Sequence, residues 1–352
     1  MRVLMLGWEY PPHIAGGLGT ACEGLSRALV RQGVSIHFVM PRVTGEETAE
    51  HMTLVGTSAR THSVALSHAG AEGEKSRYSV PASLRPYWSE SEYLTESAIL
   101  ANAGLALDSS PGAFGSTPRH GRAEVQYAGD MFTEVARFTR GTLEVSEAFD
   151  FDVIHAHDWM TFAAGVALRE RSGKPLVVHV HSLEYDRSGR DGSNARIRDL
   201  ERLGLSRADA VVAVSHYTKG IVCEEYAVAP EKVHVVHNGI YEKDIVRHYE
   251  AKHPDWPRYL VLFLGRVTYQ KGPDYFVQAA AKVVPHVPDV LFVVAGTGDM
   301  LDQVWQLARD LGVEKHFYFP GFLRGKAVEE MFSIADLYVM PSVSEPFGIA
   351  AL

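Results

Sequence analysis

The chain has 352 residues, 46% of them hydrophobic and 22% charged, which suits a globular protein with room for two domains. Its net charge of −9 and the lack of a basic run argue against nucleic-acid binding. The two cysteines have no metal-ligand spacing, and no apolar stretch approaches the ~20 residues that would span a bilayer. We therefore expect a cytoplasmic protein without a transmembrane segment.

Short apolar runs alternate with segments of helical period in the first 250 residues, a pattern typical of a parallel sheet covered on both faces. A Gly-rich loop follows the first strand and leads into a helix that ends near Gly33. Another helix is predicted over 216–226, and the irregular region 44–122 is interpreted as an insertion, near an acceptor site. The predicted strands are 2–6, 34–40, 153–155, 176–180, 210–214 and 233–236.

A proline-containing polar break separates a second domain, 259–352, from the first domain, 1–250, through a linker at 251–258. The second domain repeats the alternation, with strands at 259–264, 290–295, 317–319 and 337–340. We expect an α/β protein with two Rossmann-like, doubly wound domains facing a cleft, because ligands of parallel sheets bind at the carboxyl ends of the strands. The second sheet is expected to be incomplete, because it has about four strands instead of roughly six.

The loop Gly16-Gly17-Leu18-Gly19 lies between the first strand and the first helix. Glycines allow a ligand to approach the backbone, and a helix N-terminus attracts anions. The loop lacks the G-x-G-x-x-G spacing, which disfavours a dinucleotide-dependent dehydrogenase. By itself it is equally consistent with a strand-to-helix turn that binds nothing.

Two loops of the second domain carry charge. Arg266 and Lys271 follow the strand 259–264, and such a pair suits a diphosphate whose negative charge grows as its bond to a sugar breaks. The alternative is an exposed cationic pair on a loop. Glu345 follows the strand 337–340; it can accept hydrogen bonds from vicinal sugar hydroxyls, or simply cap a helix. The backbone amides of residues 347–349 are expected to open a helix and to hold sugar or phosphate oxygens.

Two histidine pairs, His155 with His157 and His179 with His181, each share one face of a strand. A metal centre built from them is disfavoured, because nothing resembling a helical His-x-x-x-His anchors it. We expect His155 and His179 to be hydrogen-bonded core residues, His181 to reach a sugar hydroxyl, and Asp158 to orient the neighbouring loop.

Taken together, these segments resemble the GT-B-fold retaining glycosyltransferases of the glycogen/starch synthase and group 1 (GT4-like) type. The resemblance runs from Met1 to the last residue, and it depends on the order and spacing of six motifs rather than on any one of them. The motifs are PPHIAGGL from Pro11, HAHDW from His155, HSLEYDR from His181, HNGI from His237, GRVTYQKG from Gly265 and PSVSEPFG from Pro341.

The resemblance implies a hexosyltransferase that uses a nucleotide-sugar, such as UDP-glucose or ADP-glucose, and a glycan acceptor, with neither a metal nor another cofactor. Its implied catalytic residues are Arg266, Lys271, His181 and Glu345. The residues that would contact the donor are Arg266, Lys271, Glu345, Gly16, Gly17, Leu18, Phe347, Gly348 and Ile349. Residues of the acceptor site or cleft would be His157, Asp158, Tyr185 and Asn238.

Two departures from the family pattern matter. ADP-glucose-using bacterial synthases carry a lysine where this chain has Ile14, which leaves the nucleotide open. A second glutamate of the family motif would fall one position past Leu352, so we expect a C-terminally truncated chain and leave its activity open. The favoured function is transfer of glucose to a glucan, as in glycogen synthase. Alternatives are a group 1 enzyme acting on a lipid, polysaccharide or small molecule, a nucleotide-sugar 2-epimerase, and a non-catalytic sugar-nucleotide-binding fragment.

Overall fold

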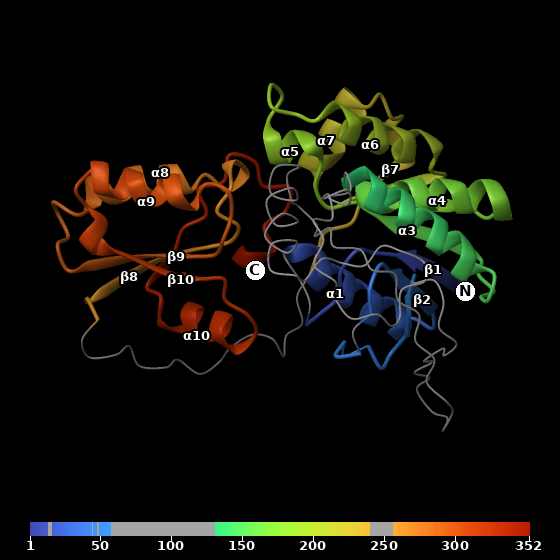
Figure 1. Cartoon of the computed structure of the whole chain (residues 1–352), viewed down its shortest axis with the longest axis horizontal. Helices are drawn as coiled ribbons and strands as arrows, with labels where there is room; N and C mark the ends of the chain where they lie inside the picture. The colour runs from blue at the N-terminus through green and yellow to red at the C-terminus, as the bar shows by residue number, and fades with distance from the viewer. Residues whose placement is uncertain (13–15, 44, 48, 58–130, 240–255) are drawn as a thin grey trace, which may run out of the picture. The chain divides into compact units, whose positions relative to one another are not determined.

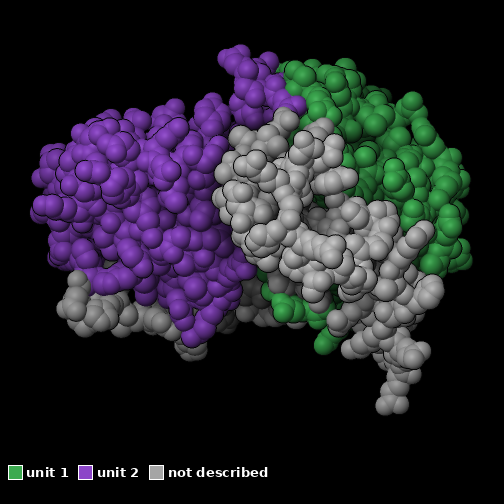
Figure 2. Space-filling view, in the orientation of Figure 1, with its two compact units in different colours: residues 1–183, 195–237 green, residues 184–194, 238–352 purple. Residues whose placement is uncertain are grey.

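The computed structural model describes residues 1–12, 16–43, 45–47, 49–57, 131–239 and 256–352 (Figure 1). The chain divides into two compact units, which Figure 2 shows in different colours. Unit 1 comprises Met1–Leu183 and Ala195–His237, and unit 2 comprises Glu184–Asn194 and Asn238–Leu352. Residues 251–255 of the predicted linker 251–258 and most of the predicted insertion 44–122 lie outside the described residues.

Unit 1 is built on a seven-stranded sheet in the order β3-β2-β1-β4-β5-β6-β7, and all of its neighbouring strands are parallel. This order, in which β1 lies between β2 and β4, is that of a doubly wound sheet. Strand β3 lies inside the region interpreted as an insertion and was not predicted. The strands are β1 (Arg2–Leu6), β2 (Ser35–Met40), β3 (Thr53–Gly56), β4 (Val153–His157), β5 (Leu176–Val180), β6 (Ala210–Ala213) and β7 (Val233–Val235).

The described helices of unit 1 include α1 (Gly17–Arg31), α3 (Met131–Ser146), α4 (Trp159–Ser172), α6 (Ala195–Arg207) and α7 (His216–Glu225). Helix α1 packs Leu18 and Cys22 against Met5 and Phe38 of the sheet. On the opposite face Gly165 of α4 lies so close to Ala156 that an added Cβ would be 3.1 Å from it. Because side chains alternate along a strand, the residues flanking Ala156 in β4 face α1.

Unit 2 contains a four-stranded parallel sheet in the order β10-β9-β8-β11. Helices α8 and α9 cover one face of it and α10 lies on the other (Figure 1). Its strands are β8 (Tyr259–Leu264), β9 (Val290–Ala295), β10 (Phe317–Gly321) and β11 (Leu337–Tyr338), and these helices are α8 (Pro273–Val283), α9 (Leu301–Asp310) and α10 (Lys326–Ile334).

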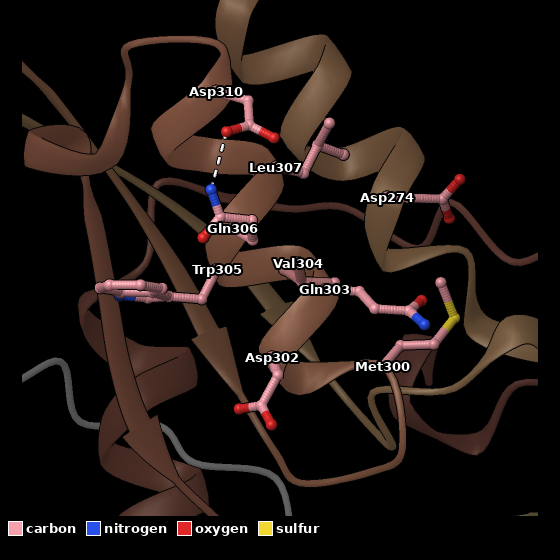
Figure 3. Close-up of a pocket in the computed structure, with 9 residues that line it drawn as sticks. All are labelled: Asp274, Met300, Asp302, Gln303, Val304, Trp305, Gln306, Leu307 and Asp310. Carbon is pink, nitrogen blue, oxygen red and sulfur yellow. Dashed lines mark hydrogen bonds between the residues drawn. The ribbon is translucent and has the colours of Figure 1, made fainter.

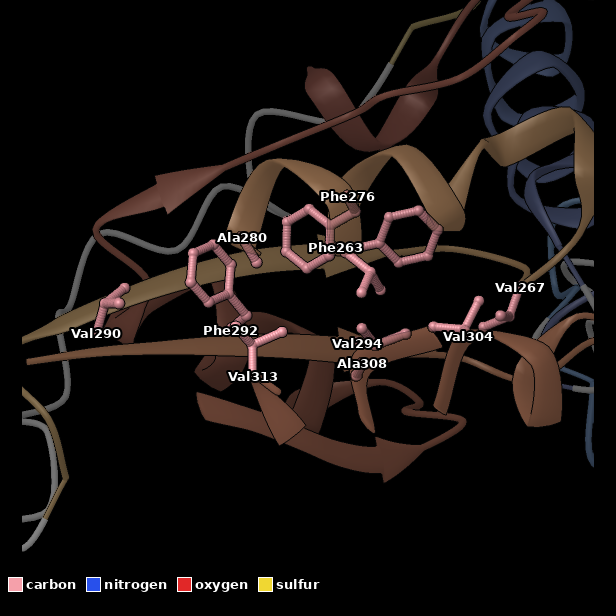
Figure 4. Packing of buried hydrophobic residues seen from close by; sticks show 11 residues of the cluster. Phe263, Val267, Phe276, Ala280, Val290, Phe292, Val294, Val304, Ala308 and Val313 are labelled. Atoms are coloured by element: carbon pink, nitrogen blue, oxygen red, sulfur yellow. The ribbon is translucent and has the colours of Figure 1, made fainter. Parts of the chain in front are cut away.

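The core of unit 2 lies mainly between the sheet and the α8–α9 layer (Figure 4). Phe276 of α8 is central to it, with its ring centroid 5.7 Å from that of Phe263 and 5.6 Å from that of Phe292. A smaller cluster on the other face joins Leu260, Leu262 and Val293 to Met331 of α10. The sheet is therefore apolar on both faces, and its polar side chains gather in the loops that follow the strands.

The structure corrects three expectations about local elements. The strand predicted over 153–155 continues to His157, so the second histidine of the pair still belongs to β4. The strand predicted over 337–340 is only two residues long, Leu337–Tyr338. The α-helix expected near 347–349 is a 3-10 turn, η5 (Ile349–Ala351), because Gly348 adopts a left-handed φ of 84° that breaks the helical path.

Candidate active site

Two loops of unit 2 meet at the carboxyl edge of its sheet. One follows β8 and runs through a 3-10 turn, η3 (Tyr269–Lys271), to Gly272, and the other follows β11 from Pro341 onward. Gly272 has a φ of 60°, and a Cβ on it would lie 2.4 Å from the carbonyl oxygen of Pro341. Only glycine permits both this conformation and this approach. The two loops are therefore in direct contact.

The contact brings together two residues that sequence reasoning had singled out in separate motifs. The ammonium group of Lys271 lies 2.8 Å and 2.6 Å from the two carboxylate oxygens of Glu345. The side chains retain 21% and 17% of their exposure, so a ligand can reach them. Burial lowers the pKa of Lys271, and the carboxylate of Glu345 opposes that shift. Ser342 donates a further hydrogen bond of 2.8 Å to Glu345.

Gln270, which sequence reasoning missed, links the cationic loop to the acidic one. Its side-chain oxygen accepts a hydrogen bond of 2.8 Å from Arg266. Its buried backbone carbonyl accepts hydrogen bonds from the N–H groups of Val343 at 2.9 Å and Ser344 at 3.3 Å. Its position next to Lys271 in the GRVTYQKG motif is the one signal that could have drawn attention to it. Arg266, Lys271 and Glu345 are thus held by a single hydrogen-bonded framework.

A third segment of unit 2 joins this framework. Helix α5 (Glu184–Ser188) carries Asp186, whose buried carboxylate accepts a hydrogen bond of 2.6 Å from the hydroxyl of Ser344. The predicted cleft residue Tyr185 is half-buried on the same helix. Asp186 was not predicted as a site residue, because the sequence does not show that α5 packs with the second sheet.

In unit 1, Asp158 connects the ends of β4 and β5. Its carboxylate accepts hydrogen bonds from the backbone N–H groups of His181 at 2.7 Å and Ser182 at 3.4 Å. Its own backbone has φ 59° and ψ 168°, a region that is nearly restricted to glycine and costs about 1–3 kcal/mol. The carboxylate contacts hold the residue in that conformation, and they give Asp158 the geometry of a residue that orients the loop after β5.

The histidines of β4 and β5, together with His181 just after β5, form a stack of four rings on the face that α1 covers. Ring centroids are 4.4 Å apart for His155 and His157 and 4.2 Å apart for His179 and His181. His157 Nδ1 and His181 Nε2 share a hydrogen bond of 2.9 Å. Burial lowers the pKa of His155 to about 4 and that of His181 to about 3, and it holds those of His157 and His179 well below the usual range. The stack is therefore neutral at physiological pH.

The expectation that His155 and His179 are hydrogen-bonded core residues is confirmed only for the burial of His179. His155 is half-buried rather than fully buried. Among the residues that the structure describes, Nε2 of His155 and both ring nitrogens of His179 have no hydrogen-bond partner. The rings of His155 and His179 are only 3° from parallel, so their in-plane ring nitrogens do not point at each other.

The same stacking bears on metal binding. Ligand atoms of His155, His157 and His179 lie within 4.8 Å of one another, as do those of Cys22, His157 and His181. A tetrahedral ion requires lone pairs that converge on one point. The rings of His155 and His179 are only 3° from parallel, so they would have to rotate before binding one ion. For the group of His155, His157 and His179, the arrangement favours a stack of neutral imidazoles over a metal centre.

The Gly-rich loop lies at the N-terminus of α1. Gly16 and Gly17 lie at the start of the helix, and the side chain of Leu18 is buried in the core, so only its backbone could meet a ligand. The N–H of Gly19 donates a hydrogen bond of 3.0 Å to the buried carboxylate of Glu9. Sequence reasoning missed Glu9, which supplies part of the negative charge that a helix N-terminus favours.

The remaining predicted site residues are partly buried. Phe347 and Gly348 are half-buried, and Ile349 opens the 3-10 turn at the end of the described chain. Asn238 is half-buried and groups with unit 2. A surface hollow of unit 2 lies elsewhere, along α9 beside Asp274 of α8, and contains none of the predicted site residues (Figure 3).

Comparison with known proteins identifies the family. A model of glycosyltransferase family 4 matches residues 107–243, and one of the glycosyl transferases group 1 matches residues 248–352. An uncharacterised glycosyltransferase of Methanocaldococcus jannaschii is 31% identical over 364 residues, covering 100% of this chain and 77% of that protein. This chain belongs to the group 1 glycosyltransferases. A glycogen synthase of Mycobacterium tuberculosis is 26% identical over 356 residues, covering 100% of this chain and 75% of that protein.

Solved structures agree on the fold. A sucrose-phosphate synthase of Thermosynechococcus elongatus has a TM-score of 0.66 at 16% identity, covering 100% of this glycosyltransferase and 78% of that chain. Anabaena HepE in complex with UDP and glucose has a TM-score of 0.58 at 16% identity, covering 99% and 77%. The protein is thus a transferase enzyme with a GT-B fold, as the motifs predicted. In the described part of the chain, every helix falls short of the length and apolar character needed to cross a membrane.

Proposed function

We propose that this glycosyltransferase moves glucose from a nucleotide-sugar to a glucan, with retention of the anomeric configuration, as a glycogen synthase does. The observation that carries the proposal is the pairing of Lys271 with Glu345 beside Arg266, because cations suited to phosphate and a carboxylate suited to sugar hydroxyls share one hydrogen-bonded framework. The similarity to a glycogen synthase, which covers all of this chain and 75% of that protein, supports the choice of glucan as acceptor.

The ion pair is the resting form of the donor site. A bound diphosphate competes with Glu345 for Lys271 and binds Arg266 through the guanidinium group. Glu345 is then released to accept hydrogen bonds from vicinal hydroxyls of the sugar. The two cations stabilise the negative charge that develops on the diphosphate as its bond to the anomeric carbon breaks. Positive charge stabilises departing phosphate groups in other enzymes in the same way.

The reaction that fits these groups is attack from the front face. The bond between the anomeric carbon and the phosphate oxygen breaks, the acceptor oxygen bonds to the same face of that carbon, and the departing phosphate oxygen takes the acceptor's proton. Neutral His181 supplies a hydrogen-bonding nitrogen to the reacting sugar without adding a charge. Asp158 holds the backbone of His181 in place. The proposed chemistry uses neither a metal nor another cofactor.

Other predicted contacts complete the proposal. The backbone of Gly16, Gly17 and Leu18 would approach the phosphates, and that of Phe347, Gly348 and Ile349 would hold sugar or phosphate oxygens. His157, Asp158, Tyr185 and Asn238 are assigned to the acceptor site or to the cleft. These roles follow from the match of this chain to the family motifs.

Transfer to a small-molecule acceptor is the second candidate, and the fold similarity to a sucrose-phosphate synthase favours it. The test is to incubate the protein with labelled UDP-glucose or ADP-glucose, first with glycogen and then with small sugar phosphates. Elongation of glycogen with retention, followed by NMR of the new linkage, supports the first proposal. Labelled product only with a small acceptor supports the second. Interconversion of UDP-N-acetyl sugars without acceptor, or donor binding without turnover, contradicts both.

A further inference from the structure

A short excursion of the chain brings α5 to unit 2. The chain leaves unit 1 after Leu183 and returns to it at Ala195, and the intervening residues Glu184–Asn194 group with unit 2. The excursion starts only three residues after His181, at the end of β5. It is therefore a part of unit 2, and its first four residues, Glu184–Arg187, belong to the HSLEYDR motif.

The excursion is closed by its own hydrogen bonds. The buried carboxylate of Glu184 accepts bonds from the hydroxyl of Ser188 at 2.9 Å, the N–H of Asn194 at 2.9 Å and the guanidinium of Arg187 at 3.1 Å. Since these bonds join the first residue of the excursion to its middle and to its last residue, they fix its shape. Asp186 thus lies in a segment whose shape these hydrogen bonds fix.

The excursion contacts both loops of the candidate active site. Gly189 lies against Tyr269 in the loop after β8, where an added Cβ would be 3.5 Å from the tyrosine ring. Asp186 accepts the 2.6 Å hydrogen bond from Ser344 in the loop after β11. A carboxylate acceptor makes this bond stronger than one between neutral groups. Asp186 is also buried, which removes competition from water.

Because Ser344 directly precedes Glu345, its hydrogen bond to Asp186 affects the position of Glu345. In the resting site, Glu345 is held by Lys271 and Ser342. When a diphosphate takes Lys271, Glu345 loses its strongest partner. Its backbone then depends on the anchors of the preceding residue, which are the Ser344 N–H on Gln270 and the Ser344 hydroxyl on Asp186.

We infer that Asp186 is a positioning residue of the transfer reaction, which acts through Ser344 to hold Glu345 where it receives the hydroxyls of the donor sugar. The inference rests on the proposed function of Glu345. It predicts that Asp186 matters for the sugar of the donor and not for the nucleotide. A purely structural role would affect both alike.

The test compares variants of the full chain by their affinity for UDP-glucose and for UDP alone, with ADP-glucose and ADP used in the same way if those are the substrates. Ser344→Ala and Asp186→Ala should each raise the KM for the sugar nucleotide about tenfold, the effect of one hydrogen bond to a charged group. The Kd for the free nucleoside diphosphate should stay within twofold. Asp186→Asn keeps an oxygen acceptor and should restore most of the affinity. The double variant Asp186→Ala with Ser344→Ala should be no worse than Asp186→Ala.

Asp191→Asn is the matched control, because it removes a carboxylate from the exposed part of the same excursion and should leave every parameter unchanged. Hydrogen exchange at the amides of residues 342–345, measured without substrate, should be faster in Ser344→Ala and Asp186→Ala than in the native chain or Asp186→Asn. Ser344→Ala carries the test alone if Asp186→Ala unfolds.

The outcomes separate the inference from the proposed function. A native chain that transfers no sugar overturns the proposed function and with it any role in transfer, while hydrogen exchange still decides whether Asp186 holds the loop. Unchanged exchange, equal weakening of the sugar nucleotide and the free diphosphate, or additive effects in the double variant would each overturn the inference.

Discussion

The two units place opposite kinds of chemistry at the carboxyl ends of their strands. In unit 1 the side chains that end β4 and β5 are four stacked, neutral imidazoles held beside a single strained aspartate. In unit 2 the corresponding loops carry an ammonium paired with a carboxylate, and a guanidinium that donates to the neutral Gln270, and all three remain partly exposed.

This difference follows from burial. A charge removed from water is costly unless it is paired, so the buried end of unit 1 contains histidines whose pKa values have fallen far enough to leave them neutral. The partly exposed loops of unit 2 can keep their charges because each charge has a partner and access to solvent. These properties agree with the proposal that unit 1 orients hydroxyl groups and that unit 2 exchanges internal partners for those of an anionic ligand.

The largest effect is expected from acid, which should act on unit 1 through its histidine stack. An unfolded histidine binds a proton near pH 6.5, whereas the buried ones resist protonation down to about pH 4 for His155 and about pH 3 for His181. The unfolded state therefore binds more protons, and stability falls as the pH drops below 6.5. The limit is about 1.4 kcal/mol per pH unit for each histidine.

Urea denaturation between pH 7 and pH 4.5 measures this loss, which should reach several kcal/mol. His234→Gln, which changes an exposed imidazole of β7, is the control and should leave the slope unchanged. A flat stability profile over this range would contradict the neutral stack.

The second effect concerns the charged end of unit 2. Lys271→Ala should lower kcat/KM for transfer by about 10²–10³, since it removes a cation from the position where negative charge develops. Initial rates with labelled nucleotide-sugar measure it. Lys282→Ala, which removes an exposed lysine of α8, should change the rate less than twofold. Equal rates for the two variants would rule out a role of Lys271 in transfer.

A third, smaller effect is expected at Asp158. Replacement by alanine removes the acceptor of two backbone hydrogen bonds and keeps the unfavourable φ, which should cost about 2 kcal/mol of unfolding free energy. Asp158→Gly relieves the backbone and should cost about 1 kcal/mol less. Chemical denaturation of both variants tests the order. Asp199→Ala, in an exposed pair with Arg202, should change stability by less than about 0.5 kcal/mol.

The smallest effect is expected at Glu9, the buried carboxylate that accepts a hydrogen bond from the N–H of Gly19 in α1. Glu9→Gln keeps an oxygen for the N–H of Gly19 but removes the charge at the N-terminus of α1, which should cost about 0.5–1 kcal/mol. Thermal unfolding at low and high salt measures it. If the charge matters, the difference from the native chain shrinks as salt rises; a difference independent of salt would point to packing instead.

Local pattern predicted the elements on which the sites are built. The strand β8 was predicted with its full bounds, 259–264, because an apolar run flanked by polar residues and a following glycine reads as a buried strand. Helix α6 was not predicted, because charged residues separate its few apolar ones and blur the helical period. Strand β3 was missed because it lies in the irregular region 44–122, which was interpreted as an insertion.

By itself, then, the sequence determined the α/β class, the family resemblance and the loops in which Arg266, Lys271, Glu345, Asp158 and the histidines lie. These features follow from periodicity and from short motifs, which are local. Only the tertiary structure decided which of these side chains meet. The pairing of Lys271 with Glu345 spans 74 residues and exists because β11 lies beside β8 in the sheet. The contact of Asp186 with Ser344 depends on an excursion whose packing no local pattern encodes, since it is set by the surfaces that fold against it.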